Sequence, residues 1–182
     1  MSLQTALDLG CGLEKAEGAI GVDIFPLEGV DVVHDLNQYP YPFEENQFDR
    51  IILSHVAEHI MDLVSFMEEI YRIAKPDAVL EIHSPHYSSC NAYIDPTHLH
   101  YFSLMTFDFF CGDTKHGYIV KSKFSVVKRD VEFWPLHDKL KWVPYNWLGP
   151  RWLARNHIVL YERFFAFIFP LKEFSVYLKV IK

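Results

Sequence analysis

The chain has 182 residues, half of them hydrophobic, and a formal net charge of -7 at pH 7. This length suffices for one domain with a sizeable core, and no repeat or low-complexity linker divides the chain, so we expect a single domain over residues 1–182. The acidic balance argues against a nucleic-acid partner, because phosphate binding depends on clustered Lys and Arg.

The cysteines and the apolar segments bear on the compartment. Cys11, Cys90 and Cys111 are odd in number and widely spaced, which disfavours a disulfide framework or a cysteine zinc site and favours a reducing compartment. No signal-peptide pattern and no apolar run of about 18 residues is present. We therefore expect a soluble, cytoplasmic protein with no membrane span.

The first predicted element is a short buried strand that ends in two glycines. Residues 5–9 are mostly apolar and run into Gly10-Cys11-Gly12. Glycine lets the backbone turn sharply and approach a ligand without a Cβ in the way. A nucleotide site can begin in this way, although two glycines separated by one residue also close many ordinary turns.

Two further strands each end close to an acidic residue. Gly21-Val22-Asp23-Ile24 is typical of the end of a second strand, and Val32-Val33-His34-Asp35-Leu36 of a third. A carboxylate in the first of these places is suited to holding both hydroxyls of a ribose. Only ten residues separate Gly12 from Asp23. A full crossover usually takes a dozen or more, so we expect the first helix to be shortened to about one turn.

A fourth strand and a helix follow a Pro- and Tyr-rich connection over residues 37–46. The strand is predicted at residues 48–53 and leads into Ser54-His55, polar residues at the end of a parallel strand that faces the ligand. Apolar residues at helical spacing predict a helix over about residues 62–74 that packs on the sheet. Lys75-Pro76 ends it, Asp77-Ala78 makes the next turn with Asp in a strained backbone or by another route, and residues 79–83 form the fifth strand.

Histidines, tyrosines and polar residues crowd the segment after the fifth strand, between residues 83 and 101. Such a segment suggests an acceptor pocket. Within it, Pro96 fixes one backbone angle between Asp95 and His98. We expect His98 to be the catalytic base and Asp95 to orient its ring, with His86 and Tyr87 as alternatives that line the same pocket.

Two other interpretations of this segment stay open. Its imidazoles could bind a metal ion through the spacings His83-x2-His86 and His98-x-His100, or they could be structural groups that bond the backbone. These spacings are common by chance, and we predict no metal.

The rest of the chain is predicted as a helix, two strands and an aromatic insertion. Ser103 is the expected N-cap of a helix through residue 110, which Gly112 ends. Residues 124–133 and 173–181 are the expected strands. The aromatic-rich segment between them is more typical of a core or homodimer face than of a membrane surface. We expect residues 83–118 and 134–172 to be acceptor-side or interface elaborations.

Taken in order, several of these motifs resemble the class I (Rossmann-like) S-adenosylmethionine-dependent methyltransferases. The resemblance runs from about residue 6 to 110 and rests on LDLGCG, GVDI, the HDL at Asp35, FDRIILSHVAEHI at residues 48–60 and the strand after Lys75-Pro76. It implies an α/β fold with a doubly wound, seven-stranded, mostly parallel sheet of order 3-2-1-4-5-7-6 with one antiparallel strand, in a three-layer sandwich. It also implies methyl transfer from S-adenosyl-L-methionine to a small-molecule acceptor, at an oxygen or nitrogen atom of a saccharide or metabolite.

The resemblance also implies a set of cofactor-binding residues. Asp8, Gly10 and Gly12 would surround the methionine end of the cofactor, Asp23 the ribose, Asp35 and Leu36 the adenine, and His55 the region near the sulfonium. The neighbouring residues that complete the set are Cys11, Ile24 and Ser54.

Two alternatives from other classes stay open. A nicotinamide-dependent oxidoreductase would need a third glycine where this chain has Lys15, and an acid about 20 residues on, whereas Asp23 comes earlier. The non-enzymatic alternative is a methyltransferase-like module that binds a ligand or partner without turnover.

Overall fold

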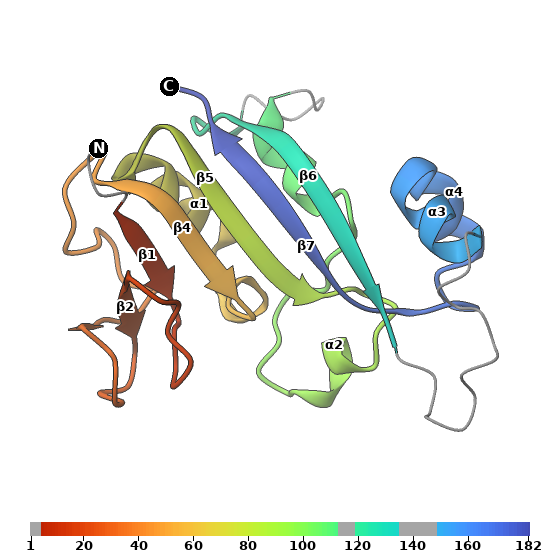
Figure 1. Cartoon of the computed structure of the whole chain (residues 1–182), viewed down its shortest axis with the longest axis horizontal. Helices are drawn as coiled ribbons and strands as arrows, with labels where there is room; N and C mark the ends of the chain where they lie inside the picture. Colours follow the sequence, from red (N-terminus) through yellow and green to blue (C-terminus); the bar gives the residue numbers. More distant parts are fainter. Residues whose placement is uncertain (1–4, 113–118, 135–148) are drawn as a thin grey trace.

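The computed structural model describes residues 5–112, 119–134 and 149–182. Its centre is a seven-stranded sheet (Figure 1). The strands are β1 (Ala6–Leu9), β2 (Ala19–Asp23), β3 (Val32–Val33), β4 (Phe48–Ser54), β5 (Ala74–Pro85), β6 (Phe124–Phe133) and β7 (Leu171–Val180). Parts of the predicted elaborations at residues 83–118 and 134–172 lie outside the described residues.

The strand order confirms the α/β sheet topology that the resemblance implies. It is β3-β2-β1-β4-β5-β7-β6. The strands from β3 to β5 pair in parallel, and β7 runs antiparallel to both β5 and β6. Parallel strands end at the same edge, so the carboxyl ends of β1, β2 and β4 lie side by side, as Figure 1 shows for the arrowheads of β1 and β4.

The helical elements of the described residues are short. They are η1 (Ala57–His59), α1 (Leu63–Ile73), α2 (Asn91–Ile94), η2 (Thr106–Cys111), α3 (Gly149–Asn156) and α4 (Ile158–Phe164). Asp62 caps α1 by accepting hydrogen bonds from the backbone N–H groups of Val64 and Ser65. After α1 the chain enters β5 directly, and Asp77 adopts a φ of 64°, so this residue does accept the strained backbone considered from the sequence.

One face of the sheet holds the core. Leu7 and Leu9 of β1 pair in register with Ile51 and Leu53 of β4, and all four side chains are buried. On β7 buried and partly exposed residues alternate, with Phe174, Val176 and Leu178 among the buried ones. This alternation indicates a sheet whose two faces differ, with apolar side chains on one face and polar side chains on the other.

The other face is polar and lacks a helical cover among the described residues. Figure 1 shows α1 behind β4 and β5, and no labelled helix lies in front of these strands. This face carries Arg50, whose guanidinium lies 2.6 Å from Glu81, and His83, which hydrogen-bonds both Glu81 and Ser175. The structure therefore differs from the three layers expected, because residues 10–18 and 24–31 contain only turns and bends where helices would have covered this face.

A second difference concerns the predicted helix after residue 103. The helix begins later, at Thr106, and is a 3₁₀ helix with no side-chain cap. Ser103 instead accepts a hydrogen bond from the N–H of Met105, which makes a local turn ahead of the helix. Gly112 ends the helix in a left-handed conformation with φ 80°, as predicted.

Candidate functional site

The glycine turn after β1 is held against the end of β2. The N–H groups of Gly10 and Cys11 both donate to the carbonyl of Val22, at 2.7 and 3.0 Å. Gly10 and Gly12 have φ values of 71° and 51°, a region that favours glycine. A Cβ on Gly10 would lie 2.4 Å from a methyl group of Val56, whereas one on Gly12 would meet no atom within 4 Å. Gly10 is thus required by packing, and Gly12 borders open space.

A pocket of about 270 Å³ opens at the carboxyl ends of β1 and β4. It is lined by Asp8, Gly10, Cys11, Leu13, Glu14, Ser54 and His55. Five of these residues were predicted to bind the cofactor, and they come from two strands that are adjacent in the sheet but distant in sequence. Leu13 and Glu14 were not predicted. Both residues follow the second glycine, Gly12. They line the pocket because the turn directs the chain back along its edge, which the sequence alone does not show.

Asp8 is the buried acid of this pocket. Its side chain is 4% exposed, and Oδ2 accepts a hydrogen bond of 2.8 Å from the N–H of Ala16. Oδ1 is buried without a hydrogen bond to the described residues. Burial raises the pKa of Asp8, and the bond from Ala16 opposes this shift. A buried acceptor without a donor is costly to fold, so Oδ1 of Asp8 can accept a hydrogen bond from a further donor at little cost.

Asp23 stands at the end of β2, beside the glycine turn. Its Oδ2 accepts from the N–H of Gly12 and its Oδ1 from the N–H of Phe25, each at 3.0 Å. These bonds fix the carboxylate while leaving lone pairs for further donors. Ile24, the next residue, has a side chain that is 53% exposed.

The predicted adenine residues lie after β3. Asp35 accepts hydrogen bonds at Oδ1 from the backbone and side-chain nitrogens of Asn37. Leu36 is buried, and its carbonyl accepts from the hydroxyl of Tyr41. Neither residue lines the pocket of Asp8, which places them at a separate position along the strand ends.

His55 follows β4 in a left-handed conformation with φ 56° and lies between two carboxylates. Its Nδ1 is 3.4 Å from Oε1 of Glu58, and its Nε2 is 3.2 Å from Oε2 of Glu173 on β7. The contact with the carboxylate of Glu58 raises the pKa of His55, burial opposes it, and Glu173 adds to the increase. Two glutamates therefore favour the protonated imidazole at the rim of the pocket.

The predicted pair of Asp95 and His98 is not formed. Oδ1 of Asp95 accepts from the N–H and the hydroxyl of Thr97, at 2.8 and 2.7 Å. Nδ1 of His98 instead contacts the carbonyl of Ala92 at 3.0 Å. Asp95 prefers its neighbour because an acid two residues before a free N–H closes an Asx turn locally. The ring of His98 is oriented by a backbone carbonyl, and Asp95 acts only as a nearby charge.

His86 has a structural environment. It is fully buried, with Nδ1 2.8 Å from the hydroxyl of Ser88 and Nε2 3.3 Å from Oε1 of Glu162 on α4. Both ring nitrogens are engaged, and the ring is closed off from solvent. The partners of His86 are Ser88 and Glu162, whereas the ring of His98 contacts Ala92 and His59, so the two histidines share none of these partners.

The metal-binding spacings considered from the sequence are not assembled either. His83 is bound to Glu81 and Ser175, and Nε2 of His100 contacts the carbonyl of Ile60 at 2.7 Å. Beside His98 the structure instead places Glu58 and His59, which sequence reasoning did not single out. Their signal was present: a Glu-His pair follows the carboxyl end of β4, the strand end that faces the ligand.

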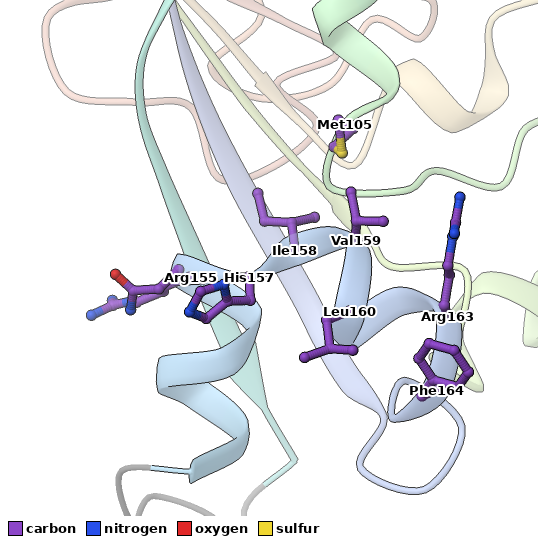
Figure 2. Close-up of a pocket in the computed structure, with 9 residues that line it drawn as sticks. Met105, Arg155, His157, Ile158, Val159, Leu160, Arg163 and Phe164 are labelled. Carbon is purple, nitrogen blue, oxygen red and sulfur yellow. The ribbon is translucent and has the colours of Figure 1, made fainter.

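A second pocket of about 540 Å³ lies at α4. Figure 2 shows Ile158 and Val159 of α4 on its side toward Met105, with Arg163 and Phe164 further along the same helix. It shares no lining residue with the pocket of Asp8.

Among the described residues, no helix has the length and apolarity needed to cross a membrane.

Comparisons with known proteins agree with this geometry. Residues 7–82 match the family model of a methyltransferase domain. A demethylmenaquinone methyltransferase of Oceanobacillus iheyensis is 30% identical over 98 residues, which cover 40% of this chain and 41% of that protein. The chain thus spans less than half the length of this curated relative.

Solved structures share the fold over almost the whole chain. A SAM-dependent methyltransferase from Archaeoglobus fulgidus superposes with a TM-score of 0.66 at 23% identity, covering 98% of this chain and 86% of that one. The [4+2]-cyclase SpnF superposes with a TM-score of 0.56 at 13% identity, covering 98% and 76%. At these identities the superpositions establish the fold alone. The strand order is that of the Rossmann-like fold of these structures, and residues 7–82, less than half of the chain, are similar to a methyltransferase domain.

Proposed function

We propose that this protein binds S-adenosyl-L-methionine and transfers its methyl group to a small-molecule acceptor. The observation that carries the proposal is the pocket at the ends of β1 and β4, with the unpaired oxygen of Asp8 inside it. S-adenosylmethionine carries an ammonium and a sulfonium group. An acceptor-only carboxylate with a free lone pair suits the ammonium, and the acids around the pocket suit a cationic ligand.

The geometry beside the pocket fits the rest of such a ligand. Gly12 has open space where a side chain would stand, so the backbone can pass against the methionine end. Asp23, already fixed by the N–H groups of Gly12 and Phe25, would accept hydrogen bonds from the two ribose hydroxyls. The exposed side chain of Ile24 and the segment at Asp35 and Leu36 would border the adenine.

The chemistry asked of the protein is mainly placement. The bound cofactor supplies an electrophilic methyl group, and the chain holds the acceptor in line with it and keeps water away. A base is needed only where the acceptor has to lose a proton. Of the three predicted catalytic side chains, His98 alone keeps a ring nitrogen without a hydrogen bond to another described residue. We therefore place His98 on the acceptor side and assign His86 and Asp95 structural roles.

A homodimer through the C-terminal segment remains part of the proposal. Exposed apolar side chains gather on α3, α4 and the residues after them, namely Trp152, Val159, Leu160, Phe164, Phe167 and Ile168. Several exposed apolar side chains on one segment of the chain support an interface there. Sedimentation of the wild type against Phe164→Asp would test it, with a shift from dimer to monomer as the expected result.

The function is tested first by binding and then by turnover. Calorimetry with S-adenosylmethionine and with NAD separates the methyltransferase from a nicotinamide-dependent enzyme, and we expect heat of binding with the former only. Transfer of a labelled methyl group to a panel of oxygen and nitrogen acceptors then tests activity. Binding without transfer to any acceptor would favour a non-catalytic module, and NAD binding alone would overturn the proposal.

A further inference from the structure

Three potential metal ligands converge beside the end of β4. Glu58 and His59 lie on η1, and His98 comes from the loop after β5. One ligating atom from each of these side chains lies within 4.8 Å of those of the other two. The two imidazole rings meet edge to face with their centroids 4.7 Å apart. Two imidazoles and one carboxylate are the ligand set of several mononuclear metal centres in proteins.

The hydrogen bonds of the two histidines engage Nδ1 of each ring and leave Nε2 available to a metal ion. A carbonyl oxygen only accepts, so the contact of His98 Nδ1 with the Ala92 carbonyl, at 3.0 Å, places the proton on Nδ1 and the lone pair on Nε2. His59 follows the same pattern. Its Nδ1 lies 2.9 Å from the hydroxyl of Thr97, and that hydroxyl donates its own proton to Asp95. Both rings therefore present the deprotonated Nε2 that a metal ion requires.

These contacts are also the supporting bonds that metal-binding histidines use. A ligating imidazole commonly donates its other N–H to a carbonyl or carboxylate, which fixes the ring and makes it a stronger ligand. Ala92 does this for His98 directly. Asp95 does it for His59 through the hydroxyl of Thr97, in a chain of two short hydrogen bonds of 2.7 and 2.9 Å. This gives Asp95 a role other than the one expected from the sequence.

Glu58 adds a buried carboxylate to the cluster, and its contact with the ring of His55 is long. Its side chain is 1% exposed, and Oε2 accepts a hydrogen bond of 3.1 Å from Ser84. Oε1 is buried and makes no hydrogen bond within the described residues, although it lies 3.4 Å from the ring of His55. A carboxylate that is buried and half satisfied is costly unless a cation or a donor completes it.

We propose that Glu58, His59 and His98 bind one divalent transition-metal ion of the Zn²⁺ type. Ligands around a tetrahedral ion stand about 3.4 Å apart when the metal–ligand bonds are about 2.1 Å long, so the ligating atoms have to approach one another by up to about 1.4 Å. His59 and His98 are partly exposed and have room to turn. Three protein ligands leave a fourth position for water or an oxygen donor of a small molecule. In the metal-bound protein, His98 is a ligand rather than a base.

Metal titration of the full chain tests this site without any methyl acceptor. Protein stripped with a chelator is titrated with Co²⁺, followed by its visible absorption, and with Zn²⁺ against a chromophoric competitor. We expect one ion per chain. His59→Ala and His98→Ala should each weaken Zn²⁺ binding by at least about 100-fold, since the loss of a ligand exceeds the 10- to 100-fold cost of losing a supporting bond.

Two further variants separate this site from scattered surface histidines. His34→Ala removes a partly buried imidazole outside the cluster, which contacts the carbonyl of Gln38, and should leave Zn²⁺ binding unchanged. Thr97→Val removes the link to Asp95 and should weaken binding by about 10-fold. If a histidine variant fails to fold, the Zn²⁺ affinity of Thr97→Val still tests the site. Equal losses in the His34 and His98 variants, or the absence of one-to-one binding in the wild type, would overturn the proposal. Either result is independent of whether the chain binds S-adenosylmethionine.

Discussion

Oδ2 of Asp23 accepts a hydrogen bond of 3.0 Å from the backbone N–H of Gly12. This bond ties the end of β2 to the glycine turn that follows β1, so the proposed ribose and methionine positions are fixed relative to each other by one carboxylate. The other oxygen of Asp23 accepts from Phe25, which turns the chain away from β2. A single acid thus shapes the backbone and stands at the proposed ribose position.

Replacing Asp23 should weaken S-adenosylmethionine binding more than replacing Asp35. Asp23→Ala leaves two vicinal hydroxyls of the ligand without their charged acceptor, which costs about 2 to 3 kcal/mol. Asp35→Ala should cost less, because apolar contacts also hold an adenine. Calorimetry on both variants checks this order. Wild-type affinity in the Asp23 variant would remove the ribose assignment.

The two glycines of the β1–β2 connection with open space around them provide a matched pair. Gly12 and Gly18 have φ values of 51° and 73°, and a Cβ on either meets no atom within 4 Å. Val at either position should therefore cost similar stability through backbone strain, about 1 to 2 kcal/mol. Only Gly12→Val places methyl groups where the methionine end is proposed. We expect this variant to lose S-adenosylmethionine binding while it still melts cooperatively, and Gly18→Val to bind like the wild type.

Other outcomes for Gly12→Val and Gly18→Val would contradict the proposed role of Gly12 in binding. If both variants bind the cofactor, the turn at Gly12 is an ordinary chain reversal, which is the alternative that the sequence left open. If Gly12→Val unfolds and Gly18→Val does not, Gly12 is needed for the fold rather than for binding.

The positions of the strands and their ends were predictable from local sequence, whereas the strand order was what the family resemblance implied. Apolar strands that end in Gly10 or Asp23 show both where a strand stops and which polar group is placed there. The short connection of ten residues between Gly12 and Asp23 also predicted that the first helix is shortened. The open polar face of the sheet was not predicted, since it depends on several connections lacking helices at once.

The contacts of the histidine-rich segment were predicted less well, because they depend on local competition for hydrogen bonds and on partners distant in the sequence. His98 lies close to Asp95 in the sequence, yet the N–H and hydroxyl of Thr97 compete for that acid and lie closer to it along the chain. The partner of His86 is Glu162, 76 residues away. Likewise, nothing near His98 in the sequence points to Glu58 and His59. Tertiary packing brings these groups together, and spacing along one chain does not encode it.

Replacing His86 should affect stability. The ring is fully buried between Ser88 and Glu162, so His86→Ala leaves a cavity and two polar groups without their partner. We expect a loss of about 2 to 4 kcal/mol in the free energy of unfolding, measured by urea denaturation. His100→Ala, which removes a partly buried imidazole that makes one bond to a carbonyl, should cost less. A His86 variant with wild-type stability but no turnover would restore the catalytic assignment.

Glu69 should make the stability of the fold depend on acid pH. It lies on α1, is 8% exposed, and binds the guanidinium of Arg72 at 2.6 Å and the N–H of Tyr41 at 2.7 Å. Burial raises the pKa of Glu69, but the bonds from Arg72 and Tyr41 outweigh it and hold the pKa below its usual value. A depressed pKa means that the ionised acid stabilises the folded state above the unfolded pKa, and that this stability is lost as the pH falls through the folded pKa.

We expect Glu69→Gln to lower the free energy of unfolding by about 1 to 3 kcal/mol at pH 7. Because protonation neutralises the wild-type side chain, this gap should narrow as the pH falls below about 4. Thermal melts of both proteins between neutral and acid pH check this, and a gap that stays constant across that range would show that Glu69 acts through its shape and not through its charge.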